Sequence, residues 1–225
     1  DTVEQRRAAD ALRDLNEQAL ACDTAEVYRM LLNVPEFMTR EDFRNTLSNE
    51  CKDSMEANFA SHQDPGRYNV RGVLLFGVAE ILRSKVCVDY LGEERIRGFG
   101  DLMKISHNGD RVSTDRGDGS YVEYDAPCDD KYLNRMIGDL SSGEVDRVSQ
   151  AQLLLQPGSY ACSTVEIDRM VDIVCSAPEV VGAQIAGAGL GGCIMAVVRK
   201  DCVEMLRKAL MESYYAPNNR DPEII

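Results

Sequence analysis

The sequence contains no tryptophan and only two histidines, His62 and His107, among its 225 residues. So few imidazoles argue against a histidine-rich metal site. Long apolar runs are also missing, since no stretch approaches the roughly 20 apolar residues that a membrane-spanning helix needs. No signal-peptide pattern opens the chain. We therefore expect a cytoplasmic protein without a membrane partner.

Positive charge is scarce as well. The chain has 25 lysines and arginines against 38 aspartates and glutamates, which gives a formal net charge of −13. An acidic surface repels nucleic acids and anionic lipids, so we exclude both as partners. A nucleotide site is still compatible with this charge, because backbone N–H groups and helix N-termini do not enter the count. The length suits one large domain or two small ones with a real core.

The cysteines show no metal-binding or disulfide framework, because none of the eight forms a Cys-x-x-Cys pair and most lie in apolar runs. Buried, reduced thiols are the expected state. The eight positions are Cys22, Cys51, Cys87, Cys128, Cys162, Cys175, Cys193 and Cys202.

Helical spacing of apolar residues covers most of the chain before residue 176 and returns near the C-terminal end. Asp23-Thr-Ala-Glu and Thr39-Arg-Glu-Asp are typical of helix starts, and the helix after Thr39 is expected to continue towards Phe59. Helices are predicted over residues 2–20, 24–32, 40–59, 68–90, 99–107, 129–138, 144–155, 164–175 and 201–214.

Residues 108–130 differ in composition, since glycine, aspartate, serine and threonine dominate there. We expect a surface loop with a short strand around Tyr121. The aspartates of this loop do not have the spacing of a calcium-binding loop, so a solvated acidic segment is expected and no metal site. With strands concentrated late in the chain, the pattern predicts an α+β fold.

The most informative stretch is residues 181–198, in which two apolar, β-prone runs flank Gly187, Gly189, Gly191 and Gly192. Glycine allows positive φ and close backbone approach, and consecutive free N–H groups suit phosphate. A dinucleotide-binding loop would need a helix after the glycines, whereas a strand follows here. Two interpretations stay open: a loop close to a phosphate, or a hairpin whose glycines only allow tight packing.

Four segments resemble the galactokinase branch of the GHMP kinases. Residues 99–107 are similar to that family's Phe-Gly-x-Leu-Met-x-x-Ser-His, and residues 160–168 to its Val-Ser-Cys-Pro-Glu-Leu-Asp segment. Residues 182–193 resemble its glycine-rich signature, and residues 78–83 its Val-Gly-Glu-Ile-Arg-Arg helix. The resemblance spans most of the chain.

The resemblance implies one GHMP kinase C-terminal domain over residues 1–225, with a ferredoxin-like antiparallel sheet and several packed helices. Residues 1–107 would be mostly helical, residues 108–160 an insertion with helices, and residues 161–225 the glycine hairpin and a closing helix. The family's serine-rich phosphate loop is not found in the sequence. The N-terminal ATP-binding half, with its catalytic groups, is therefore expected to be absent from these residues.

The implied activity is transfer of a phosphoryl group from ATP, with Mg²⁺, to a hydroxyl of galactose or a similar sugar. The four loop glycines would lie near the phosphates, Gln184 and His107 would line the cleft, and no catalytic residue is expected here. Gln184, Ala186 and Phe76 depart from the family pattern, which leaves the sugar open. The isolated chain is expected to be inactive, and the alternative is a non-catalytic sugar- or nucleotide-responsive binding module. The oligomeric state stays open.

Overall fold

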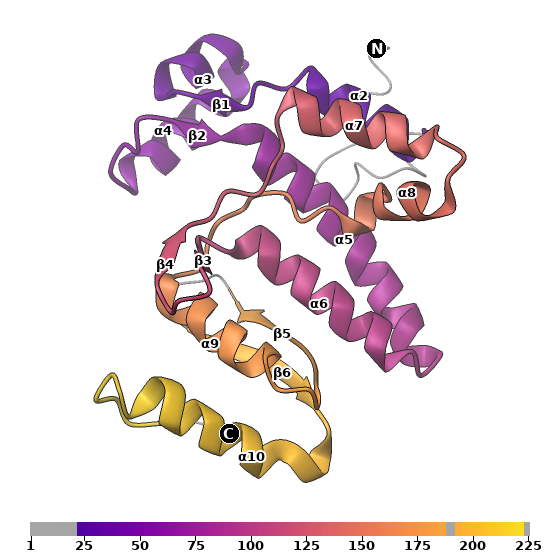
Figure 1. Ribbon diagram of the computed structural model, residues 1–225. Helices are drawn as coiled ribbons and strands as arrows, with labels where there is room; N and C mark the ends of the chain where they lie inside the picture. The colour runs from indigo at the N-terminus through magenta and orange to yellow at the C-terminus, as the bar shows by residue number, and fades with distance from the viewer. Residues whose placement is uncertain (1–21, 188–191, 223–225) are drawn as a thin grey trace.

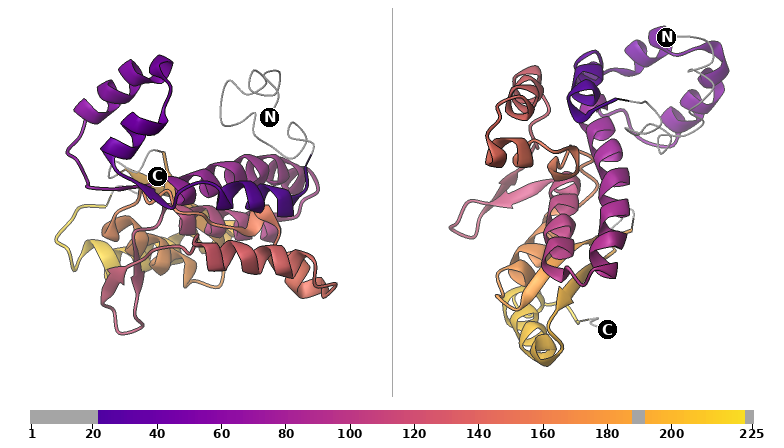
Figure 2. Two further views of the ribbon diagram at one scale, coloured as in Figure 1. Left: turned by 90° about the horizontal axis from the view of Figure 1, so that it is seen from above. Right: turned by 90° about the vertical axis from the view of Figure 1, so that its right-hand side faces the viewer.

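Helix α5 (Val70–Gly92) runs through the middle of the computed structural model, which describes residues 22–187 and 192–222. It corresponds to the helix predicted over residues 68–90, and Asn69 begins it by accepting the N–H of Gly72 at 2.9 Å. Helix α6 (Ile96–Asp110) follows after a short turn and lies beside α5 (Figures 1 and 2). These two helices connect the upper and lower parts of the molecule.

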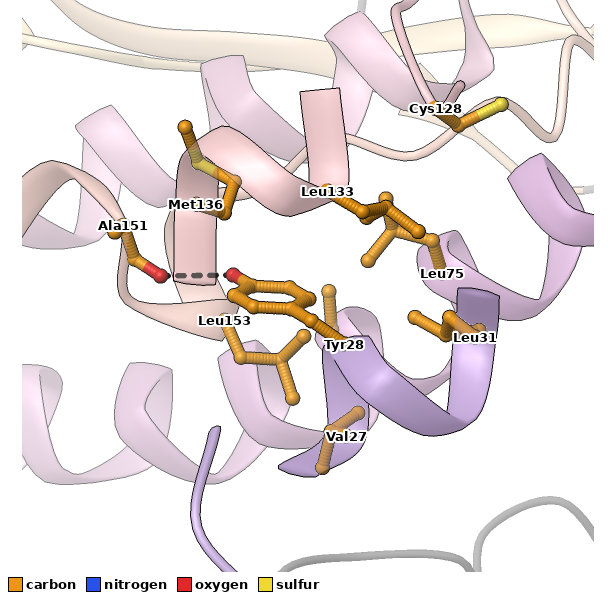
Figure 3. Packing of buried hydrophobic residues seen from close by; sticks show 10 residues of the cluster. Val27, Tyr28, Leu31, Leu75, Cys128, Leu133, Met136, Ala151 and Leu153 are labelled. Atoms are coloured by element: carbon orange, nitrogen blue, oxygen red, sulfur yellow. Dashed lines mark hydrogen bonds between the residues drawn. The ribbon is translucent and has the colours of Figure 1, made fainter. Parts of the chain in front are cut away.

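The upper part is a helical cluster around α2 (Thr24–Leu32) and α7 (Asp130–Leu140), which pack on α5 (Figure 1). Helix α8 (Val145–Gln150) and a 3-10 turn (Leu153–Leu155) close it. Tyr28 is fully buried, and its hydroxyl donates to the Ala151 carbonyl at 2.8 Å (Figure 3). Sequence alone predicted one helix over 144–155, but the chain leaves helical geometry after Gln150.

A small lobe projects from this cluster, made of β1 (Phe37–Met38), α3 (Arg40–Thr46), α4 (Lys52–Ala60) and β2 (Tyr68–Asn69) (Figure 1). Strands β1 and β2 pair antiparallel at its base. Its own aromatic cluster consists of Phe43, Phe59 and Tyr68, with ring centroids 5.7–6.0 Å apart.

Buried Arg71 at the start of α5 holds the base of this lobe to the helical cluster. It donates to the Val34 carbonyl at 2.8 Å and pairs with Asp130 at 2.6 Å and Glu36 at 3.2 Å. The lobe is therefore joined to the rest through its two short strands and this arginine.

The lobe confirms one sequence prediction and corrects another. Thr39 and Asp42 form the expected capping box at the start of α3. The expected continuous helix to Phe59 is wrong, because Leu47 takes an extended conformation with ψ 145°. A 3-10 turn (Asn49–Cys51) then leads into α4 as a separate helix.

The lower part holds the glycine-rich stretch. Helix α9 (Val165–Cys175) leads to β5 (Val180–Ala186), which pairs with β6 (Cys193–Val198). After a 3-10 turn (Lys200–Cys202), α10 (Val203–Leu210) packs beneath the hairpin and ends in a π-helical turn (Met211–Tyr215) (Figure 1). Thr164 caps the start of α9, since its hydroxyl accepts the N–H of Ile167.

The α+β class and the antiparallel pairing are confirmed. Strands β3 (Ser113–Asp115) and β4 (Tyr121–Glu123) form an antiparallel hairpin in the predicted surface segment. Within the described residues each of the three sheets has two strands. None of the helices in this part of the chain is long and apolar enough to span a bilayer.

Candidate functional site

The candidate site is built on the β5–β6 hairpin. The two strands pair with Ile185 opposite Ile194 and Ala186 opposite Cys193. Gly187 then leaves the strand with φ +79°, a left-handed conformation that favours glycine. Gly189 and Gly191 lie outside the described residues. The predicted strand, loop and strand order is therefore present, with a glycine at each described end of the loop.

The loop glycines at the two described ends are not required by close packing. Among the described residues, a Cβ atom at Gly187 would have no atom within 4 Å, and one at Gly192 would meet only the Ala186 carbonyl at 3.5 Å. By contrast, a Cβ at Gly182 would lie 2.3 Å from the Gly100 carbonyl oxygen. Close packing therefore explains the glycine at position 182 in the strand. At position 187 glycine allows the positive φ, and the space beside Gly192 is open among the described residues.

Helix α6 fixes the position of β5. At one end, the backbones of Gly100 and Gly182 touch, as the absence of both Cβ atoms allows. Further along, the N–H of Ile185 donates to Nδ1 of His107 at 3.3 Å. Ile185 precedes Gly187 by two residues, so the helix holds the strand close to where the loop begins.

His107 is 1% exposed, so its ring contacts β5 and α9 and not solvent. Burial, and secondly the charge of Arg111, lower the pKa of His107 to about 4, although Asp168 opposes them. The ring is therefore neutral at pH 7. Because Nδ1 accepts the Ile185 N–H, the ring proton is on Nε2, 3.4 Å from Oδ1 of Asp168.

Asp168 is the fully buried centre of this arrangement. Its Oδ2 accepts hydrogen bonds from the Val112 N–H at 3.0 Å, the Ser113 N–H at 2.8 Å and the Ser113 hydroxyl at 3.0 Å. One turn further along α9, Asp172 pairs with Arg111 at 2.6 Å. Helix α9, the end of α6 and the start of β3 are thereby held together behind the hairpin.

A second polar cluster lies between α5 and α6. Glu80 accepts from the Ser106 hydroxyl at 3.0 Å and pairs with buried Arg83 at 2.7 Å. On the same helix as Ser106, Asp110 accepts from the Cys162 thiol at 3.2 Å, and burial raises its pKa to about 6.

The Cys162 thiol is not an activated nucleophile. Burial and then the Asp110 carboxylate raise its pKa to about 12, so it stays protonated at neutral pH. The cluster therefore joins α5, α6 and the segment at Cys162, and this thiol is not activated for covalent catalysis.

Gln184, the other predicted cleft residue, is half-buried on β5 opposite Met195. The cleft was expected to form with a second half of the protein, so lining roles for Gln184 and His107 stay predictions. Glu80 and Asp168 lie in two of the segments that resemble the galactokinase family, whereas Asp110 lies just after a third. Glu80 and Asp168 share a signal, an acidic residue within an apolar helical pattern, which a buried hydrogen-bonded carboxylate explains.

Part of the chain is similar to a known protein family. Residues 136–216, from the end of α7 to the turn after α10, match the family model described as "GHMP kinases C terminal". This region is therefore similar to the C-terminal domain of GHMP kinases. The candidate loop, β5, β6 and α9 all lie within the matched residues, whereas α6 lies before them.

Several curated galactokinases are similar to this chain. The galactokinase of Streptococcus thermophilus strain LMD-9 is 25% identical over 172 residues, which cover 73% of this chain and 42% of the relative. The galactokinase of Exiguobacterium sibiricum is 26% identical over 137 residues, 61% of this chain and 23% of the relative. The chain thus spans less than half the length of these relatives.

Proposed function

We propose that this chain is the C-terminal part of a galactokinase-like sugar kinase, which transfers the γ-phosphoryl group of ATP to a hydroxyl of galactose or a similar sugar. The glycine hairpin carries the proposal. It lies in the matched region, α6 and His107 fix its strand, and Gly192 is free of any packing need. The names of the similar proteins supply the sugar class.

In such an enzyme, catalysis rests on positioning and on stabilising charge that develops on the phosphoryl group. The hairpin would present main-chain N–H groups to the cleft, where fixed donors stabilise an anion. The main phosphate loop and the catalytic base belong to an N-terminal half in this proposal.

The described residues do not fit a magnesium site by themselves. They contain no group of three or more aspartate, glutamate, histidine or cysteine side chains arranged to hold a metal ion. Mg²⁺ would therefore be held mainly by the ATP phosphates, with one or two protein carboxylates.

The proposal is tested by measuring ADP release with MgATP and galactose. The isolated chain should show no turnover, and expression together with an N-terminal half should restore it. In that complete enzyme, Gly192→Val should lower kcat about 100-fold, because a side chain enters the space beside the loop. Gly138→Val in α7, where a Cβ also meets nothing within 4 Å, is the matched control and should leave kcat unchanged.

Two results would contradict the proposal. Turnover by the isolated chain would remove the need for a second half. Micromolar binding of ATP or galactose by the isolated chain in calorimetry, without turnover in any combination, would instead favour the sugar- or nucleotide-responsive binding module.

A further inference from the structure

Asp168 on α9 and His107 on α6 meet in the interior of the lower part, where both side chains are almost fully buried. Oδ1 of Asp168 and Nε2 of His107 lie 3.4 Å apart, and neither atom has another hydrogen-bond partner among the described residues. A buried polar atom without a partner lowers stability. The two atoms are therefore complementary only when one of them carries a proton and the other accepts it.

The second carboxylate oxygen shows which way Asp168 is turned. Oδ2 accepts the N–H groups of Val112 and Ser113 and the Ser113 hydroxyl at 2.8–3.0 Å. Three donors around one oxygen leave no place for a proton on it. The two backbone N–H groups come from consecutive residues between α6 and β3, so Oδ2 cannot exchange places with a donor without losing both hydrogen bonds.

The second ring nitrogen shows where the proton of His107 lies. Nδ1 accepts the Ile185 N–H at 3.3 Å, and a backbone N–H can only donate. The proton of the neutral ring is therefore on Nε2, which faces Oδ1 of Asp168. A proton on Oδ1 would reverse this order, because it would be donated to Nε2 and would leave the ring proton on Nδ1, against the Ile185 N–H.

We propose that Asp168 is a positioning residue for the glycine loop, because its carboxylate holds His107 in the Nε2–H tautomer that accepts the N–H of Ile185. The chain leaves β5 at Gly187, only two residues after Ile185, so this hydrogen bond fixes the strand where the loop begins. The other tautomer would set two N–H groups against each other and release this end of β5. The effect on phosphoryl transfer rests on the proposed function, whereas the tautomer does not.

The substitution Asp168→Asn should reverse the tautomer with almost no change in volume. The amide has one oxygen, and this oxygen should stay with Val112 and Ser113, because turning it away would set the amide N–H groups against two backbone donors. The amide nitrogen then takes the place of Oδ1 and donates to Nε2 of His107. The ring proton moves to Nδ1, where it faces the Ile185 N–H.

NMR of the ring nitrogens in the whole chain near neutral pH tests the tautomer directly. His62→Gln leaves His107 as the only histidine, so its two nitrogens are observed without overlap. We expect a protonated Nε2 and an unprotonated Nδ1, and Asp168→Asn should interchange them. In that variant the Ile185 amide should exchange with solvent about tenfold faster, because it loses its acceptor.

The matched control is Asp172→Asn, which removes a carboxylate from the same helix. Asp172 lies one turn after Asp168 and its charge also acts on His107, but it pairs with Arg111 and not with the ring. This variant should keep the proton on Nε2. The control thus separates the hydrogen bond from the general effect of a nearby negative charge.

Kinetics of the complete enzyme test the positioning role. Asp168→Asn should lower kcat about tenfold and leave the KM for galactose within about twofold, because a displaced loop loses interactions made in the transition state. His107→Asn has no tautomer to select, and its amide oxygen can still accept the Ile185 N–H. Adding Asp168→Asn to this variant should therefore lower kcat by no more than about twofold further, whereas a purely structural role would lower it equally in both backgrounds.

Three outcomes would overturn the proposal. The first is a ring proton on Nδ1 in the chain with Asp168 intact, a result that decides the matter even where Asp168→Asn does not fold. The second is a protonated Nε2 and an unchanged Ile185 amide in Asp168→Asn. The third is an unchanged kcat despite the reversed tautomer. A complete enzyme without any turnover would contradict the proposed function instead, and the NMR results would still decide whether Asp168 selects the tautomer.

Discussion

At the residue scale, His107 and Asp110 lie one turn apart on α6 and respond to burial in opposite directions. Burial lowers the pKa of His107 from 6.5 to about 4 and raises the pKa of Asp110 from 3.8 to about 6. In both cases the uncharged form is favoured, because neither side chain has a fully compensating charged partner in the interior. The side chains of His107 and Asp110 are therefore both mainly uncharged near pH 5.

These two shifts affect stability with opposite sign. Between pH 6.5 and 4 the unfolded chain protonates His107 and the folded chain does not, so stability falls as the pH drops. Between pH 3.8 and 6 the folded chain keeps the Asp110 proton that the unfolded chain loses, so stability falls as the pH rises. In the natural sequence the two effects largely cancel.

The substitution Asp110→Asn removes the opposing carboxyl, so the pH dependence of stability should then show the effect of His107 alone. The free energy of unfolding of this variant should rise by about 3 kcal/mol from pH 4 to pH 6.5. His107→Asn, whose amide oxygen can still accept the Ile185 N–H, should show the reverse slope, falling by about 3 kcal/mol from pH 4 to pH 6. Urea titrations across this range measure both, and parallel pH profiles in the two variants would contradict the assignment.

At the element scale, the contact of α6 with β5 decides where the glycine loop lies. Sequence patterns located the helix, both strands and the loop, because apolar periodicity and glycine clustering are local signals. They could not show that Gly100 touches Gly182 or that His107 accepts from Ile185, because these residues are distant in sequence. The end of α3 at Leu47 was not predicted either, because leucine is not a residue that breaks helices.

A pair of glycine substitutions separates packing from open space. Gly182→Ala should lower the free energy of unfolding by about 3 kcal/mol, because its Cβ would overlap the backbone of α6. Gly192→Ala should change it by less than about 0.5 kcal/mol, since its Cβ makes only an ordinary contact. Denaturant unfolding measures both, and equal effects would show that the hairpin does not pack on α6 in this way.

At the scale of the whole molecule, α5 and α6 join the two parts of the chain (Figure 1). The eight thiols are distributed over both parts. All eight cysteines lie in described residues and none is paired with another. Cys51 in the lobe and Cys193 at the start of β6 are exposed, and the other six are buried or half-buried. The sequence predicted buried, reduced thiols. The thiols are unpaired as expected, but burial is wrong for Cys51 and Cys193, and only Cys128 and Cys202 are fully buried.

A thiol-reactive reagent should therefore modify two cysteines of the native chain rapidly and all eight after unfolding. Cys51→Ser and Cys193→Ser should each remove one rapid reaction, and the double variant should remove both. Retention of two rapid thiols in the double variant would show that the fold exposes other cysteines than these.

The lobe has a consequence for how the native chain opens. It is attached through two two-residue strands and Arg71, and its aromatic cluster lies apart from the main cores. Its detachment therefore disturbs few contacts elsewhere, so the lobe can unfold as a separate cooperative unit. Residues 61–67 are exposed throughout, which makes this turn one of the places where a protease would cut the native chain. Such a cut would leave the glycine hairpin intact.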